Sequence, residues 1–241
     1  MPAGSASHRT LAAVTFDVDG VLIDSPHERA WREALQGFTD PARFTTEIYQ
    51  AHVAGKPRFS GARAALEQLG VANVAQRTEA YAERKQQILE ALIAARDFTV
   101  YPDALRFARA LVGRGIPLAV ASSSKNANQM MRLIHLSQDQ TLLDLFVANV
   151  CGRDLSHGKP DPEIFLIAAQ ELGVAPATCL VVEDAPAGIA AARAGGMMAL
   201  GIARLGDAAL LRAACADLVV TSLDDVDLDA LITGQLRARE K

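Results

Sequence analysis

Short apolar runs alternate with amphipathic segments along most of the chain. The apolar runs are rich in Val, Leu and Ala and occupy residues 11–16, 116–124, 145–152, 178–185, 197–202 and 217–222. Helical patterns follow at 103–113, 126–136, 162–172, 186–194, 207–214 and 225–232. Continuous apolar strands separated by helices are typical of a parallel sheet that is covered on both faces. The pattern therefore predicts an α/β fold built on a doubly wound parallel sheet.

Residues 26 to about 97 have a different pattern. Charged and polar side chains recur there with helical spacing, as in AYAERKQQILEALIAA at 80–95. A segment of about seventy residues is too long for a loop, so we predict an inserted helical cap. We place the sheet domain at 1–24 and 99–241 and the cap domain at 25–98. Two connections, near Asp24 and near residues 101–102, would let the cap open and close over the sheet.

Local signals mark some helix ends. The sequence SPHE at 25–28 matches a capping box with proline at the first helical position, which predicts a helix that begins at Pro26. The pair DP at 161–162 predicts a second helix start. The glycines at 195–196 predict the end of the preceding helix.

The composition excludes several classes of function. Half of the 241 residues are hydrophobic, as expected for a globular protein with a core, and the net charge of −4 argues against nucleic-acid binding. The longest apolar run is too short to span a bilayer, and the first ten residues lack the apolar segment of a secretory signal. The three cysteines show no pairing, which indicates free thiols in a reducing cytoplasm. We expect a monomer or a weak dimer.

Polar residues gather where the expected strands end. The stretch TFDVDGVLID at 15–24 closes the first strand with Asp17 and Asp19, which point to the same side because they are two residues apart. Other polar groups follow the later strands, namely Ser122, Lys159, Glu183 and Asp184. Because ligands bind at the carboxyl ends of parallel strands, we expect all of these groups to converge.

This set combines four carboxylates with one lysine. Gathering so much negative charge costs several kcal/mol unless a cation compensates it. Oxygen ligands suit Mg²⁺ better than Zn²⁺, and Mg²⁺ often shares a phosphate oxygen of the substrate. The chain has no Walker loop, so a carboxylate remains as the candidate nucleophile. The alternatives are a strand-end turn at Asp17 and Asp19 and a solvated loop lysine at Lys159.

Four ordered segments match a known family. They are DVDGVLID at 17–24, VASSSKN at 120–126, GKPDPEIF at 158–165 and VVEDAPAGI at 181–189. They resemble the motifs of the haloacid dehalogenase superfamily of phosphatases and phosphomutases, and the insertion resembles the cap of its β-phosphoglucomutase-like subgroup. The resemblance implies a Rossmann-like core, Mg²⁺ as the cofactor and a small phosphorylated molecule as the substrate.

The resemblance also implies roles for the core residues. Asp17 would be the nucleophile that forms an aspartyl phosphate, and Asp19 would be the general acid and base. Ser122 and Lys159 would hold the phosphoryl oxygens. The groups implied as Mg²⁺ ligands are Asp17, the backbone carbonyl of Asp19 and Asp184, with Glu183 in or near that shell.

Five further residues resemble substrate-binding positions. Arg58 in AGKPRFSG matches an arginine that the family places on the distal phosphate of a bisphosphorylated sugar. Lys85 resembles a cap residue that contacts the sugar, and His27 resembles a histidine that positions the acid/base aspartate. Lys125 and Asn126 match substrate-side residues of the mutases. Arg58, Lys85 and His27 could instead be exposed side chains of cap helices, and Trp31 fits the cap core.

One departure concerns the hinge. His27 follows Asp24 by three positions, two fewer than in the mutases, and Pro26 stiffens the connection. We expect a Mg²⁺-dependent phosphatase that acts on a small phosphorylated metabolite, a sugar phosphate, through an aspartyl phosphate. The first alternative is a β-phosphoglucomutase that interconverts β-glucose 1-phosphate and glucose 6-phosphate. A second alternative is a non-catalytic protein that binds a phosphorylated metabolite.

Overall fold

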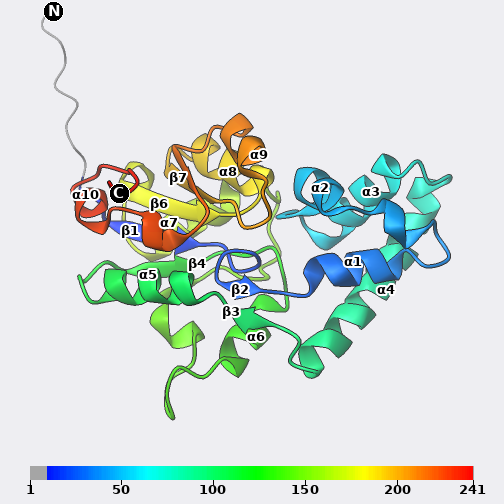
Figure 1. Cartoon of the computed structure of the whole chain (residues 1–241), viewed down its shortest axis with the longest axis horizontal. Helices are drawn as coiled ribbons and strands as arrows, with labels where there is room; N and C mark the ends of the chain where they lie inside the picture. Colours follow the sequence, from blue (N-terminus) through cyan, green and yellow to red (C-terminus); the bar gives the residue numbers. More distant parts are fainter. Residues whose placement is uncertain (1–9, 241) are drawn as a thin grey trace, which may run out of the picture.

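A parallel sheet of six strands forms the centre of the molecule (Figure 1). The computed structural model describes residues 10–240. The expectation that the chain does not start with a secretory signal concerns residues that lie almost entirely outside this range. The strand order is β5-β4-β1-β6-β7-β8 and every pair is parallel. The strands are β1 Ala13–Phe16, β4 Leu118–Val120, β5 Ala148–Asn149, β6 Cys179–Glu183, β7 Met198–Ile202 and β8 Leu218–Val220. The predicted doubly wound parallel sheet is confirmed.

Helices cover both faces of this sheet (Figure 1). One face, with large side chains such as Phe16 and Leu180, packs against α5 Pro102–Val112, α6 Ala127–Leu133 and α10 Leu228–Ile232. The other face, with small side chains such as Ala13 and Ala119, packs against α7 Glu163–Glu171, α8 Pro186–Ala194 and α9 Ala208–Ala213. Burial on both faces explains why the strands are continuous apolar runs rather than alternating ones.

The inserted helices lie beside the sheet, on the right in Figure 1. They are α1 His27–Ala34, α2 Thr46–Ile48, α3 Arg58–Gln68 and α4 Val74–Ala94, with short turns at η1 Pro41–Arg43 and η2 Tyr49–Val53. A separate apolar cluster that includes Trp31, Phe44 and Tyr81 holds them together. The last turns of α4 pack against the sheet layer through Leu89 and Ile93. The exact domain bounds remain a prediction.

The two connections to the insertion pair with each other. Strand β2 Ile23–Asp24 and strand β3 Thr99–Val100 form a short antiparallel ribbon, which the sequence pattern does not reveal. Ile23 lies opposite Val100 and Asp24 opposite Thr99. Two residues are too few for the alternation that identifies a strand. The hinge is therefore a single paired element rather than two separate strands of chain.

The structure corrects two local predictions and confirms a third. The capping box at 25–28 is not formed, because α1 begins at His27 without a side-chain cap and Glu28 instead accepts hydrogen bonds from Arg32 and Thr46. Strand β5 is shorter than the expected run at 145–152, because only Ala148 and Asn149 pair with β4 and Leu145 belongs to the 3-10 turn η3 Leu143–Leu145. Helix α8 ends at Ala194, before a glycine with a positive φ at 196, as predicted.

The remaining elements are short turns that join strands and helices. They are η4 Pro176–Thr178, before β6, and η5 Leu223–Asp225, after β8. Cys151 and Cys179 are buried, Cys215 is exposed, and all three are free thiols. Within residues 10–240, no helix combines the length and the hydropathy that crossing a membrane requires.

Gly188 in the first turn of α8 allows this helix to pack directly on the end of β6. A Cβ at this position would lie 1.8 Å from Glu183 Oε1, far inside van der Waals contact. We expect Gly188→Ala to lower the free energy of unfolding by about 3 kcal/mol, as measured by urea denaturation.

Gly113→Ala is the matched control for this substitution. Gly113 ends helix α5 with an ordinary helical φ, and the nearest atom to its Cβ would be 3.4 Å away. We expect a change below about 1 kcal/mol there. Equal losses in both variants would show that the close approach of α8 to Glu183 is not required.

Candidate active site

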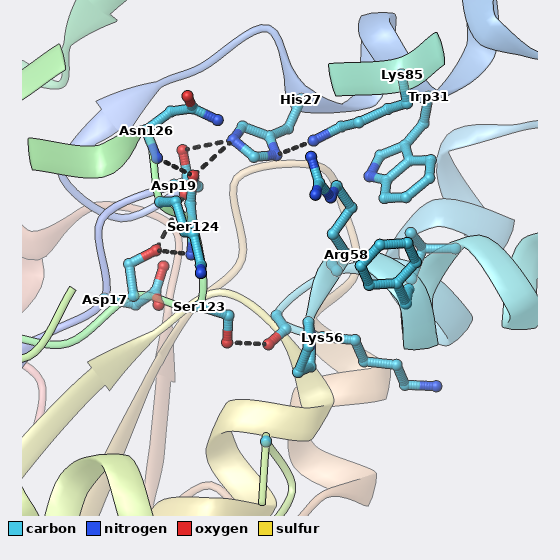
Figure 2. A pocket seen from close by; sticks show the side chains of 18 of the residues that line it. Asp17, Asp19, His27, Trp31, Lys56, Arg58, Lys85, Ser123, Ser124 and Asn126 are labelled. Carbon is cyan, nitrogen blue, oxygen red and sulfur yellow. Dashed lines mark hydrogen bonds and ion pairs between the residues drawn. The ribbon is translucent and has the colours of Figure 1, made fainter. Parts of the chain in front are cut away.

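The predicted core residues meet at the carboxyl ends of β1, β4 and β6. Strand β1 lies between β4 and β6, so the strand order changes direction here, and a crevice forms at such a point. A cavity of about 560 Å³ lies over this edge, between the sheet and the inserted helices. Figure 2 shows the side chains that line it. The whole lining includes Asp17, Asp19, Ser122, Lys125, Asn126 and Asp184 from the core and His27, Arg58 and Lys85 from the insertion.

Lys159 occupies the buried centre of the site. Its Nζ lies 2.5 Å from Asp17 Oδ1 and 2.5 Å from Glu183 Oε1. Burial alone would lower the pKa of Lys159, but the charges of the two carboxylates outweigh burial and raise it. Glu183 is fully buried, and its Oε2 accepts a hydrogen bond of 2.9 Å from the backbone N–H of Ala185. Both oxygens of Glu183 are thus engaged, and Glu183 directs Lys159 toward Asp17.

Asp17 and Asp184 are buried carboxylates that repel each other. Burial is the main cause that raises the pKa of each, and the negative charges around Asp184 raise its pKa further. The side chain of Asp184 lies against Gly20, where a Cβ would be 2.0 Å from Asp184 Oδ2. Gly20 has a φ of +81° and makes the turn directly after Asp19. Asp17, Glu183 and Asp184 carry more negative charge than the single Lys159 compensates, and such an all-oxygen set fits a hard cation such as Mg²⁺.

Asp19 faces both the core and the insertion. Ser122 Oγ donates a hydrogen bond of 3.3 Å to Asp19 Oδ2, and His27 Nε2 lies 3.5 Å from Asp19 Oδ1. Burial raises the pKa of Asp19, while nearby hydroxyl groups and the charge of Lys85 partly oppose this rise. A carboxyl group with a raised pKa can both give and take a proton closer to neutral pH.

His27 connects Asp19 to the insertion (Figure 2). Its Nδ1 lies 3.1 Å from Lys85 Nζ, and its Nε2 lies 3.3 Å from Ser124 Oγ. Burial, and then the charge of Lys85, lowers the pKa of His27 well below its usual range. A neutral imidazole that accepts from Lys85 at Nδ1 carries its proton on Nε2, toward Asp19. The shortened hinge therefore still brings His27 to Asp19.

Lys85 extends from α4 into the cavity and is only 3% exposed. Burial lowers its pKa to about 7, against the charge of Asp19 and together with that of Arg58. Its ammonium lies 4.8 Å from the centre of the Trp31 ring. Trp31 is buried in the insertion, and it also lines the cavity. A buried ammonium group of this kind gains stabilisation when an anion enters.

The other predicted substrate-binding residues each have a protein partner. Arg58 pairs with Glu83 at 3.2 Å, and Lys125 pairs with Asp154 at 2.7 Å. Asn126 exchanges two amide hydrogen bonds with Gln86 of α4, at 3.2 and 3.3 Å. The structure thus brings these residues to the cavity, with their polar groups already paired.

Two serines that the sequence analysis does not single out join the core to the insertion. Ser123 Oγ donates a hydrogen bond of 3.0 Å to the carbonyl of Gly55, and Ser124 contacts His27 (Figure 2). The loop at 54–58 makes a second close contact, since a Cβ at Gly158 would lie 2.2 Å from Pro57 Cγ. The only signal in the sequence is that both serines directly follow Ser122.

Comparison with known proteins identifies the family. Residues 11–196 match the model of the haloacid dehalogenase-like hydrolase family. The chain belongs to the haloacid dehalogenase-like hydrolase family. It is therefore an enzyme, and the family resemblance of its four motifs is confirmed. Members of this family generally use Mg²⁺.

Relatives of this hydrolase carry two kinds of names. β-Phosphoglucomutase of Mycobacterium bovis is 34% identical over 244 residues, which cover 89% of this chain and 90% of that protein. Fructose-1-phosphate phosphatase YqaB of Escherichia coli is 34% identical over 195 residues, covering 79% and 96%. The crystal structure of the β-phosphoglucomutase of Pyrococcus sp. strain ST 04 is 30% identical, with a TM-score of 0.70 and coverage of 92% and 97%.

The buried ammonium of Lys85 predicts a trade between stability and activity. A pKa near 7 in place of 10.5 corresponds to a penalty of at most about 5 kcal/mol on the folded state below pH 7. We expect Lys85→Met to raise the free energy of unfolding at pH 6 and to lower kcat/KM. Between about pH 7 and 10.5 the unfolded protein binds more protons, so wild-type stability rises with pH and the difference shrinks.

Urea unfolding of both proteins at pH 6 and pH 9 measures this effect. Lys125→Met is the control, because the side chain of Lys125 is 68% exposed and its removal should leave stability nearly unchanged. A Lys85→Met protein that is less stable than wild type at both pH values would contradict the expectation.

Proposed function

We propose that this hydrolase removes the phosphoryl group of a small phosphorylated sugar through an aspartyl phosphate on Asp17. One observation carries the proposal: Lys159 is fixed against Asp17 beneath a cavity that Asp19 also lines. An ammonium at this point can neutralise charge on a transferring phosphoryl group. Asp19, with its raised pKa, is placed to give a proton to the sugar oxygen that leaves phosphorus.

The proposed reaction has two steps. A carboxylate oxygen of Asp17 attacks phosphorus, the ester P–O bond breaks, and Asp19 gives its proton to the departing sugar oxygen. Asp19 then takes a proton from water as that water attacks phosphorus. The bond between phosphorus and Asp17 breaks, which releases phosphate and regenerates both carboxyl groups. Ser122 and Lys159 bind the phosphoryl oxygens in both steps.

We propose Asp17, the backbone carbonyl of Asp19 and Asp184 as the groups that hold Mg²⁺. When bound, the ion would neutralise the facing carboxylates and polarise a phosphoryl oxygen. The raised pKa values of Asp17 and Asp184 support this assignment, because burial is their main cause and the single charge of Lys159 does not offset it. Glu183 was expected in or near this shell, and its two engaged oxygens favour a role in orienting Lys159.

The substrate-side groups of the cavity are already paired within the protein, which supports water as the acceptor of the phosphoryl group. Arg58 is the group that would bind a second phosphate, and Lys125 and Asn126 would lie on the substrate side; their partners are Glu83, Asp154 and Gln86. A second phosphate would have to displace these partners before it gained contacts of its own. A substrate with one phosphate leaves them in place.

The free cysteines and the charge balance support a cytoplasmic enzyme that works as a monomer or weak dimer, without nucleic acid or membrane as partners.

A specific observation favours β-phosphoglucomutase as the second candidate. His27 of the insertion reaches Asp19 across the cavity, and Lys85 contacts His27 from behind, so the insertion stands over the site. A closed site excludes water and gives a sugar hydroxyl the advantage as acceptor. The choice between the two candidates depends on which acceptor reaches the aspartyl phosphate first.

Asp17→Asn tests whether Asp17 is the nucleophile. An amide cannot form the acyl phosphate, so turnover should fall by about 10³-fold or more while the fold is retained. Phosphate release from a sugar phosphate with Mg²⁺ measures the loss, and circular dichroism checks the fold. Asp139→Asn changes an exposed carboxylate and should keep wild-type activity. Full turnover by Asp17→Asn would remove Asp17 from the mechanism.

The products distinguish the two candidates. The protein is incubated with β-glucose 1-phosphate, Mg²⁺ and a trace of glucose 1,6-bisphosphate, and both glucose 6-phosphate and free phosphate are followed. We expect free phosphate without glucose 6-phosphate, because the groups for a second phosphate are already paired. Glucose 6-phosphate with little free phosphate would identify a mutase. If neither forms, a panel of phosphate esters identifies a different substrate.

A further inference from the structure

Arg204 lies outside the four motifs, yet its guanidinium contacts the turn that follows Asp19. It stands in the loop after β7, and its side chain is 11% exposed. Its Nε donates to the carbonyl of Gly20 at 3.1 Å, and one Nη donates to the carbonyl of Val21 at 3.2 Å. A single side chain therefore holds two consecutive carbonyls of the turn.

The same guanidinium is bound on its other side by the start of α5. Asp103 accepts two hydrogen bonds of 3.1 Å from it, and the ring of Tyr101 lies 3.7 Å from its central carbon. Tyr101 directly follows β3, the second strand of the hinge ribbon, and its N–H donates to the carbonyl of Leu22 at 2.9 Å. Arg204 thus contacts both the turn that follows Asp19 and the residue that follows the hinge ribbon.

Asp103 is itself fixed from a third segment. Its Oδ2 accepts from the N–H of Leu223 at 2.8 Å and from Ser222 Oγ at 3.3 Å. Burial would raise the pKa of Asp103, but these hydrogen bonds and Arg204 outweigh burial and lower it. The carboxylate of Asp103 therefore stays ionised. Its hydrogen bonds to Leu223 and Ser222 keep it in place if the guanidinium of Arg204 moves. The turn after Asp19 is held against a rigid support rather than a mobile side chain.

We propose that Arg204 is a positioning residue that fixes the Asp19 turn relative to the hinge, so that cap position and the orientation of Asp19 are linked. The acid/base role of Asp19 in this proposal rests on the proposed function. The link between the Asp19 turn and the hinge rests on the contacts alone. Four hydrogen bonds in one plane require the fork of an arginine. A lysine keeps the charge but cannot bind both carbonyls and both carboxylate oxygens.

Two kinds of substrate separate positioning of Asp19 from general support of the fold. A sugar phosphate needs a proton on its leaving oxygen, whereas p-nitrophenyl phosphate has a leaving group that departs without one. The value of kcat/KM reports the steps up to departure of the leaving group. We expect Arg204→Lys to lose about 10- to 100-fold in kcat/KM with a sugar phosphate that the wild type turns over, and less than about 3-fold with p-nitrophenyl phosphate. Asp19→Asn should show the same selective loss.

Amide hydrogen exchange tests the link to the hinge without any substrate. We expect Arg204→Lys and Arg204→Met to speed exchange at residues 18–24 and at residues 99–103 together, with other strands unchanged. Arg193→Lys is the matched control, because Arg193 of α8 pairs with Asp217 directly before β8, away from both segments. The control should leave both exchange and kinetics as in the wild type.

The results that would overturn the inference differ from those that would overturn the function. Unchanged exchange at either segment, or equal loss of kcat/KM with both substrates, would remove the positioning role of Arg204. Absence of turnover by the wild type on every phosphate ester would refute the proposed function, and the exchange experiment would still decide whether Arg204 links the turn to the hinge.

Discussion

The buried ion pair of Lys159 with Asp17 and Glu183 is the interaction on which the site depends. Three charged groups are taken out of water, and that cost is offset because Lys159 binds both carboxylates and Glu183 also accepts from the N–H of Ala185. Gly188 makes room for Glu183, and the turn at Gly20 makes room for Asp184. The backbone of two glycines thus determines where the carboxylates lie, and the insertion adds its groups to this fixed base.

Sequence patterns predict the core of the site well because strand topology places it. Residues at the carboxyl ends of parallel strands converge wherever the strand order reverses, so Asp17, Ser122 and Glu183 follow from the strands alone. The partners across the cavity do not follow. Gln86 pairs with Asn126 only because two separately built layers approach each other, and no local spacing encodes that approach. The lost capping box has a similar cause, since Thr46 at the start of α2 binds Glu28.

Stability and function place opposite demands on the insertion. Lys85 is an ammonium buried against an aromatic ring and a neutral histidine, which is unfavourable until an anion arrives. Arg58 and Lys125 avoid this cost because their side chains are 34% and 68% exposed and each pairs with a carboxylate, whereas Asn126 is uncharged and pairs with Gln86. The cavity therefore has one buried cation that would gain most from the entry of an anion, and other polar groups whose interactions are already satisfied.

The contacts between the core and the insertion are largely made by uncharged groups. Ser123 with Gly55, Gln86 with Asn126, and Ser124 with a neutral His27 are hydrogen bonds between dipoles. Such bonds are not screened by dissolved ions in the way that surface charge pairs are. The resting closure of this enzyme should therefore be nearly independent of ionic strength, and salt acts on catalysis through the charge of the substrate instead.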